Sequence, residues 1–128
     1  MKTHVKLGLA MLAGFGLGAV ATQGLNAQGK PLVYTVTEIE ITNLDAYVKD
    51  YAPLAQASIK SSGGKLLAAG QKITALEGTP PKSRVAIQAW DSVETAQKWR
   101  ASADYKKARE VGDKYAKFRA YAVEGMPQ

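Results

Sequence analysis

The chain of 128 residues contains no cysteine and a single histidine, His4. The absence of cysteine excludes disulfides, thiolate nucleophiles, zinc–thiolate sites and a lipid-modified N-terminal cysteine. Acidic residues are the minority, because 11 Asp and Glu stand against 17 Lys and Arg for a net charge of +6. That balance alone would favour nucleic acid or an acidic membrane as partner. A hydrophobic share of 46% is nevertheless ordinary for a folded protein, and the length allows one domain.

Residues 1–27 are arranged like a secretory signal peptide. Lys2 and Lys6 precede an uncharged run over residues 7–21, which a polar stretch follows. This order of charge, apolar run and small-residue exit is typical of export. Cleavage fits after either Ala21 or Ala27, and we favour Ala27.

An uncleaved membrane anchor is the alternative for this segment. Fifteen apolar residues would span only about 22 Å as a helix, short of a hydrocarbon core of about 30 Å. We therefore expect cleavage, no stable membrane span afterwards, and a periplasmic or secreted protein. The remaining residues, 28–128, would have a net charge of +4 and no histidine, since Lys2, His4 and Lys6 are lost. Export and this lower charge both argue against nucleic acid as partner.

Residues 28–128 predict one α+β domain. Val33–Ile41 alternates β-branched residues on one face with mixed residues on the other, as in a strand. Pro53 lies inside the first predicted helix and predicts a bend near Tyr51. The predicted elements are strands over Val33–Ile41, Lys65–Ala69, Lys72–Leu76, Arg84–Trp90 and Phe118–Glu124, a helix from a cap at Thr42-Asn43 to Ser61, a loop over Glu77–Pro81, and a helix from Ser92 that restarts at Ser102.

The order of these elements is that of a ferredoxin-like βαββαβ sandwich, with a four-stranded antiparallel sheet and helices on one face. The short strand over Lys72–Leu76 would be an addition to this plan. The other face of the sheet would then be uncovered. Because a monomer seldom exposes a whole apolar sheet face, we expect two copies to pair there as a homodimer, a dimeric α/β barrel.

Several short motifs carry a family resemblance. They are Tyr34 with Glu38-Ile39, Tyr47 with Tyr51, Gly63-Gly64 before LLAAG, Leu76-Glu77-Gly78, Arg84–Ile87, Ser92 to Trp99, Ser102 with Tyr105 and Ala108-Arg109, and Val123–Gly125. In this order and spacing the chain resembles the bacterial domain-of-unknown-function family numbered 1330, from about Tyr34 to Gly125. The resemblance implies the dimeric α/β-barrel fold and a homodimer, and it implies no reaction. The chain departs from the family pattern in its export signal and in Lys65, where arginine is usual.

The first set of candidate site residues is polar and lies on the predicted sheet. Alternation places Arg84, Gln88 and Trp90 on one face of their strand. We expect Glu38 to join them on the face toward the dimer partner. An Arg84–Glu38 pair beside a tryptophan could bind a small polar or aromatic molecule, or Arg84 could hold a carboxylate. The alternative is an interface ion pair, which buried pairs more often represent.

The second set combines aromatic rings with one cation on the predicted helices. Tyr47, Tyr51, Trp99 and Tyr105 could line a pocket between helices and sheet, with Arg109 as an anion anchor. Aromatic residues at helical spacing are more often part of the core.

Glu77, in the predicted loop, could act as an acid or base near a pocket mouth. The alternative is that its carboxylate receives backbone N–H bonds in the turn.

We expect no metal and no cofactor, since the carboxylates are scattered and residues 28–128 lack His and Cys. The sequence therefore predicts an exported, homodimeric module that binds a small molecule or serves as an accessory protein. The alternative is a cofactor-independent isomerase, lyase or monooxygenase-like enzyme acting on a small, for example aromatic, substrate.

Overall fold

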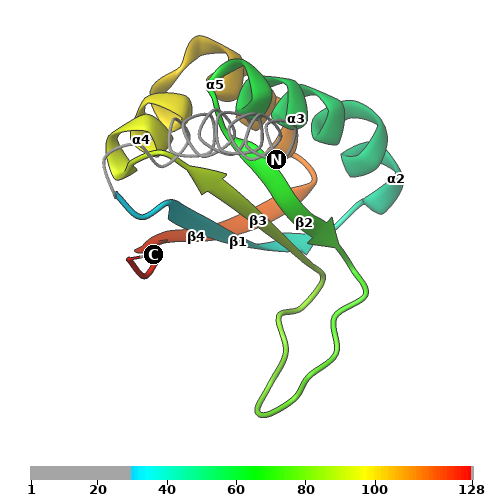
Figure 1. The fold of residues 1–128 in the computed structure, drawn as a ribbon. Helices are drawn as coiled ribbons and strands as arrows, with labels where there is room; N and C mark the ends of the chain where they lie inside the picture. The colour runs from blue at the N-terminus through cyan, green and yellow to red at the C-terminus, as the bar shows by residue number, and fades with distance from the viewer. Residues whose placement is uncertain (1–29, 128) are drawn as a thin grey trace, which may run out of the picture. The chain divides into compact units, whose positions relative to one another are not determined.

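Four strands form one antiparallel sheet, and helices run along a single face of it (Figure 1). The computed structural model describes residues 30–127, so the predicted signal peptide lies outside the described residues. Within them, Leu32–Met126 is one unit. The elements are β1 (Val33–Ile41), α2 (Leu44–Ala46), the π-helical turn η1 (Tyr47–Tyr51), α3 (Ala52–Ser61), β2 (Lys65–Gly70), β3 (Arg84–Trp90), α4 (Val93–Ala101), α5 (Ala103–Gly112) and β4 (Ala116–Glu124).

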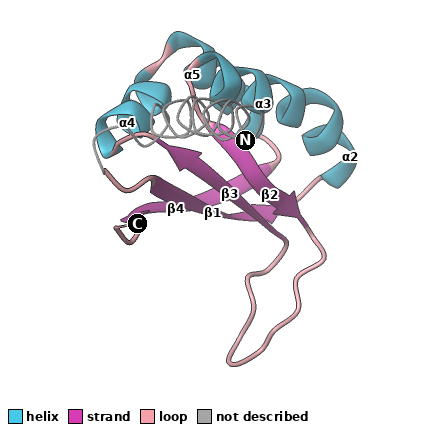
Figure 2. Cartoon of the chain, in the orientation of Figure 1, coloured by secondary structure: helices cyan, strands magenta, loops and turns pink. Residues whose placement is uncertain are grey.

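The strands are arranged in the order β2-β3-β1-β4 (Figure 2). Each neighbouring pair is antiparallel. This order, together with helices on one face, confirms the predicted ferredoxin-like fold. The last strand begins at Ala116, two residues earlier than expected, because its pairing with β1 extends to Ile41.

Strand β1 lies in the middle of the sheet and separates its two faces. Val33, Thr35, Thr37 and Ile39 are buried under the helices. The intervening residues, which include Val36, are only half-buried on the opposite face, which we call the open face. Residues that pair across antiparallel strands share a face, so the register of β1 assigns the faces of β3 and β4 as well.

The first helical segment begins at a side-chain cap and passes through η1 before Pro53. The Asn43 Oδ1 accepts a hydrogen bond from the Ala46 N–H at 3.1 Å, as the sequence predicts. The Ala52 N–H donates to the Tyr47 carbonyl, which is the wider spacing of a π-helix. Since Pro53 has no N–H and its ring would crowd the preceding turn, a wider turn accommodates it. The predicted irregularity near Tyr51 therefore takes the form of a π-helical turn.

Not every apolar residue of this segment is buried. Val48 is 50% exposed and Leu44 is also exposed. The two tyrosines alone occupy the buried face of η1. Leu44 and Val48 therefore point away from the core that the tyrosines contact.

The second helical segment is in two pieces, as predicted, and Ser102 joins them. The Ser102 hydroxyl donates to the Trp99 carbonyl at 2.7 Å and accepts from the Tyr105 N–H at 3.2 Å. The same side chain therefore ends α4 and begins α5. Ser92 caps the start of α4 by accepting from the Thr95 N–H at 3.1 Å.

The strand expected over Lys72–Leu76 does not form. Residues 71–83 instead make a long loop that projects from the sheet on the side away from the helices (Figure 1). The outer edge of β2 is free, because β2 is the edge strand of the sheet, but none of residues 71–76 is buried and Leu76 is 96% exposed. A hairpin strand that makes no core contact is at best marginally stable in water.

Aromatic side chains fill much of the layer between sheet and helices. Trp90 and Trp99 stack with centroids 5.1 Å apart, and Trp99 and Tyr105 with centroids 4.3 Å apart. Gly64 has no side chain where the Trp90 ring packs, since a Cβ there would lie 2.5 Å from the ring. The glycine pair that the sequence marks as a helix stop thus also admits the tryptophan.

Among residues 30–127, no helix has both the length and the apolar character that a membrane crossing needs.

Candidate functional site

The structure places Arg84, Gln88 and Trp90 under the helices. Arg84 pairs with Ile39 and Gln88 with Thr35 across the β1–β3 ladder, so they share the buried face of β1. The sequence interpretation placed them on the face toward the dimer partner, and this was wrong. Both faces of β3 contain apolar residues, so alternation separates the faces without saying which one the helices cover.

Glu38 lies on the open face, opposite to Arg84. Its Oε2 accepts a hydrogen bond from Arg119 Nη1 at 2.6 Å, across the β1–β4 ladder. The expected Glu38–Arg84 pair is therefore wrong, and Arg119 takes the role assigned to Arg84. None of the ion pairs found within residues 30–127 includes Arg84.

The indole groups of the core have their hydrogen bonds satisfied within the protein. Trp90 Nε1 donates to Thr35 Oγ1 at 3.1 Å, and Thr35 in turn donates to Gln88 Oε1 at 2.8 Å. Trp99 Nε1 donates to Ser58 Oγ at 2.9 Å. Trp90 therefore serves the core.

A small cavity, here called the inner cavity, lies between the sheet and the first helical segment. Its volume is about 40 Å³, which is room for a few water molecules or one small group. The polar and aromatic residues around it are Thr37 on β1, Tyr47 and Tyr51 on η1, the exposed Gln56 on α3, Arg84 and Gln88 on β3, Trp99 on α4 and Tyr105 on α5. The structure thus brings most of both predicted sets together at one place.

Four polar side chains of the inner cavity are at least nine-tenths buried. The Tyr47 hydroxyl lies beside Arg84 and the Tyr51 hydroxyl beside Tyr105. The Thr37 hydroxyl and the nitrogen of the Gln88 amide make none of the side-chain hydrogen bonds found within residues 30–127. No fully enclosed side-chain N or O in the described part of the chain lacks a partner. These polar atoms therefore face space that water or a ligand can reach.

Burial sets the ionisation of the cavity tyrosines. Burial raises the pKa of Tyr47, and the positive charge of the nearby Arg84 offsets part of this. Burial also raises the pKa of Tyr51 strongly, helped by the neighbouring Tyr105 and Tyr47. Both phenols consequently stay protonated at neutral pH and can donate hydrogen bonds.

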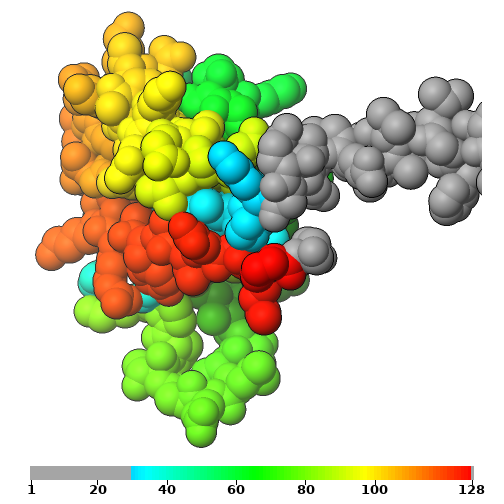
Figure 3. All heavy atoms as spheres, turned by 60° about the vertical axis from the view of Figure 1, so that its left-hand side comes forward, coloured from blue at the N-terminus to red at the C-terminus, as the bar shows by residue number. Residues whose placement is uncertain are grey.

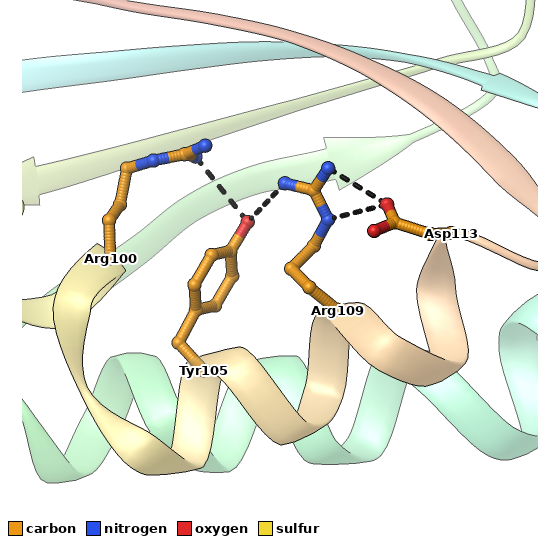
Figure 4. A network of polar contacts seen from close by, with 4 residues as sticks. All are labelled: Arg100, Tyr105, Arg109 and Asp113. Carbon is orange, nitrogen blue, oxygen red and sulfur yellow. Dashed lines mark hydrogen bonds and ion pairs between the residues drawn. The ribbon is translucent and has the colours of Figure 1, made fainter.

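Arg109 is engaged in a chain of polar contacts beside the cavity (Figure 4). Its guanidinium donates to Tyr105 Oη at 3.0 Å and to Asp113 Oδ1 at 3.0 Å, and it lies 4.0 Å from the centroid of Phe118. Burial alone would lower the pKa of Arg109, but the contacts with Tyr105 and Asp113 outweigh it and raise the pKa. Arg109 thus has its own acidic partner, which weakens its role as an anchor for a ligand anion.

Arg100 completes that chain from the other side. Its Nη1 lies 3.4 Å from Tyr105 Oη, a long hydrogen bond (Figure 4). Its guanidinium carbon lies 5.3 Å from the ring centroid of Tyr105 and 6.0 Å from that of Trp99. It has no carboxylate partner within residues 30–127. Arg100 is not among the predicted site residues, because helical spacing does not show that its side chain turns toward Tyr105.

A larger hollow, here called the α4–β4 cleft, lies between α4 and the edge of the sheet. Figure 3 shows α4 in yellow directly above β4 in red. The cleft has a volume of about 250 Å³. Its lining residues are Thr35 and Thr37 on β1, Val93, Ala96, Gln97, Trp99 and Arg100 on α4, and Ala120, Tyr121 and Ala122 on β4.

The cleft exists because β4 presents small residues to the helices. Ala120 and Ala122 pair with Thr37 and Thr35, so they face the helix side of the sheet, where they remain exposed. The cleft and the inner cavity share Thr37 and Trp99 in their walls. The cleft could not be predicted from the sequence, because an alanine does not by itself indicate a binding site. Only the strand register places Ala120 and Ala122 beneath α4.

Glu77 does not belong to this site. It is exposed in the loop of residues 71–83, and none of the side-chain hydrogen bonds found within the described range holds it. The described residues contain no group of three or more His, Asp or Glu side chains placed to bind a metal ion.

Comparison with known proteins gives a family and a fold. The model of the family described as domain of unknown function (DUF1330) matches residues 32–126. None of the curated protein sequences compared with the chain matches it.

Three solved structures illustrate the fold. A protein of unknown function from Rhodopseudomonas palustris has a TM-score of 0.62 at 16% identity, over 83% of this chain and 95% of that one. SnoaB, a cofactor-independent oxygenase from Streptomyces nogalater, has a TM-score of 0.57 at 11% identity, over 77% of this chain and 96% of its own. An ethyl tert-butyl ether d (ethd) family protein from Bacillus halodurans has a TM-score of 0.51 at 13% identity, over 74% and 99%. At these identities the likeness shows the fold alone.

Proposed function

We propose that this chain, which belongs to the family of domains of unknown function DUF1330, binds a small molecule in the α4–β4 cleft. The observation that carries this proposal is a hollow of about 250 Å³ over the inner face of the sheet, where small residues of β4 leave the layer unfilled. Natural cores are packed closely, with few voids larger than a water molecule. The hollow beside this packed layer therefore offers a partly enclosed space in which a small molecule can lie.

The walls of the cleft indicate the kind of molecule. Trp99 supplies aromatic surface, and Val93 and Ala96 supply aliphatic surface, whereas the Tyr121 side chain lies on the open face beside Arg119. Polar groups are few, as is usual where a small molecule binds. The body of the ligand is therefore mainly apolar or aromatic.

A cofactor-independent enzyme is the second candidate. It is favoured by the tyrosine hydroxyls of the inner cavity, which lie behind the shared wall of Thr37 and Trp99 and could exchange a proton with a substrate. SnoaB, which shares the fold, is a cofactor-independent oxygenase. Binding is better supported, because no carboxylate or imidazole lines either hollow in the described residues. If the wild type consumes oxygen or a bound molecule and Tyr51→Phe does not, the enzyme is favoured.

Two further features belong to the proposal. The arrangement of residues 1–27 supports export to the periplasm or the medium. The open face of the sheet supports a homodimer, because Val36, Ile87 and Tyr121 adjoin there across three strands.

The test is ligand retention combined with a variant that fills the cleft. Native mass spectrometry of protein purified from its own host should show a bound small molecule in addition to the protein mass. The neutral fluorophore 1-aminonaphthalene should bind to the emptied protein. Ala122→Leu should weaken that binding by about tenfold, since the added side chain occupies the hollow.

Ala57→Leu is the matched control, because it makes the same change at an exposed position of α3. It should bind the fluorophore like the wild type. The proposal is overturned if no ligand is retained and if Ala122→Leu binds the fluorophore as the wild type does while remaining folded.

A further inference from the structure

The inner cavity is chemically different from the α4–β4 cleft. The buried polar groups in its wall include hydrogen-bond donors: the hydroxyls of Tyr47, Tyr51 and Thr37 and the amide nitrogen of Gln88. Arg84 adds a positive charge. No acidic side chain lines this space in the described part of the chain. Buried hydrogen-bond donors beside one cation, with no anion among them, leave a positive charge that no acidic side chain compensates.

We infer that the inner cavity is a receptor for a small carboxylate, held by Arg84, the hydroxyls of Tyr47 and Tyr51, and the Gln88 amide. This goes beyond the proposed function, because it concerns a second hollow and does not require the cleft to be occupied.

The position of Arg84 supports the inference. Its guanidinium carbon lies 5.5 Å from the centroid of the Tyr47 ring, so the side chain extends along the cavity wall. Glu38, which could have neutralised it, lies on the opposite face of the sheet with Arg119. Arg84 is therefore a half-buried cation without a carboxylate partner within residues 30–127. A planar guanidinium fits a carboxylate through two parallel hydrogen bonds.

The protonation of the tyrosines fits the same ligand. Burial holds the pKa of Tyr47 and of Tyr51 above the ordinary value of a phenol. Both side chains are therefore neutral donors at physiological pH, and they would not repel an anion.

The size and rigidity of the cavity limit the ligand. About 40 Å³ admits a group of a few heavy atoms, such as a carboxylate with a short tail. The wall is fixed by packing: the Tyr51 ring lies 5.0 Å from that of Tyr47 and 5.4 Å from that of Phe118, centroid to centroid. A Cβ at Gly112 would lie 2.5 Å from the Tyr51 ring, so the bare glycine backbone is what allows this position. A receptor whose donors are held in place loses little entropy when the ligand binds.

The experiment uses sodium acetate as the probe and acetamide as its neutral isostere. In ¹H–¹⁵N NMR spectra of the whole protein, acetate should shift the side-chain amide resonances of Gln88 and the indole resonance of Trp99 in a saturable way. Acetamide should bind at least tenfold more weakly. Tyr51→Phe and Tyr47→Phe, which each remove one hydroxyl, should weaken acetate binding by about tenfold, as expected for a hydrogen bond to a charged group. Arg84→Met should weaken it further.

Tyr115→Phe is the matched control, because Tyr115 is half-buried and does not line the inner cavity. It should bind acetate like the wild type. The inference is overturned if acetate shifts neither set of resonances, if acetamide binds equally well, or if the tyrosine variants bind like the wild type. Tighter binding of phosphate than of acetate would also overturn it. Failure of the cleft proposal would show separately, as unchanged 1-aminonaphthalene binding by Ala122→Leu.

Discussion

Tyr51 shows how one residue serves both the core and the site. Its ring packs between Tyr47 and Phe118 and against the bare backbone of Gly112. Its hydroxyl lies beside Tyr105 in the wall of the inner cavity. The ring contributes apolar burial, and the oxygen adds a polar group to the cavity wall.

The buried phenols should make the protein sensitive to alkali. The folded state holds the pKa of Tyr51 and of Tyr47 above the ordinary value of about 10. Their protonation therefore stabilises the fold fully below pH 10, and this contribution is lost as pH rises above it, where the unfolded chain releases the protons first.

Urea denaturation at several pH values checks this expectation. The free energy of unfolding of the wild type should fall from about pH 10 upward. The free energy of unfolding of Tyr51→Phe should fall less steeply with pH, because phenylalanine has no proton to lose. Comparison of the two proteins at pH 7 separates this effect from any general loss of stability. Equal slopes for the two proteins would contradict the assignment.

At the scale of elements, Ser102 connects two helices and the polar network beside the cavity. Its hydroxyl closes α4 at Trp99 and opens α5 at Tyr105. Trp99 is in the wall of both hollows, and Tyr105 holds Arg109 and Arg100. A single cap thus fixes the relative positions of two aromatic residues of the site.

Ser102→Ala should lower the free energy of unfolding by about 1 kcal/mol, the usual cost of losing an N-cap. Ser102→Thr keeps the hydroxyl and should lose much less. Thermal or urea denaturation followed by circular dichroism measures both. If the two variants are equally destabilised, the loss is steric and the cap is not its cause.

The loop of residues 71–83 shows the opposite case, an element that local pattern predicts wrongly. The segment Lys72–Leu76 alternates well enough for a strand. The outer edge of β2 stays unpaired, and the segment buries no side chain against the core, so it remains a loop. Local preference does not decide the outcome when a tertiary partner is missing.

At the scale of the whole molecule, the open face of the sheet is the largest feature without a partner. Val36 on β1 pairs with Ile87 on β3 and with Tyr121 on β4, so three apolar residues adjoin at its centre. The proposed homodimer would bury this face.

Val36→Glu should therefore reduce the molar mass in light scattering from that of a dimer to that of a monomer, since an unpaired charge inside an interface is costly. Val48→Glu is the matched control, because Val48 is equally apolar but lies on the helical side, in η1. It should remain dimeric. A wild-type protein that is monomeric at micromolar concentration, or a folded Val36→Glu protein with unchanged mass, would contradict the dimer.

The sequence by itself determined the fold class, the helix caps and the break at Ser102, because each depends on residues that are near one another in the chain. Asn43 caps the helix three residues away, and Pro53 disturbs the turn before it. The family match over residues 32–126 and the strand order confirm this part.

Only the tertiary structure decided which side chains meet. Alternation placed Arg84, Gln88 and Trp90 on one face but could not say that the helices cover it, because both faces of the sheet contain apolar residues. The register between strands then separated Glu38 from Arg84 and gave it to Arg119. The alanines of β4 became the floor of a cleft only because α4 lies over them. Pairings between distant segments depend on the packing of the whole chain, which a local pattern does not contain.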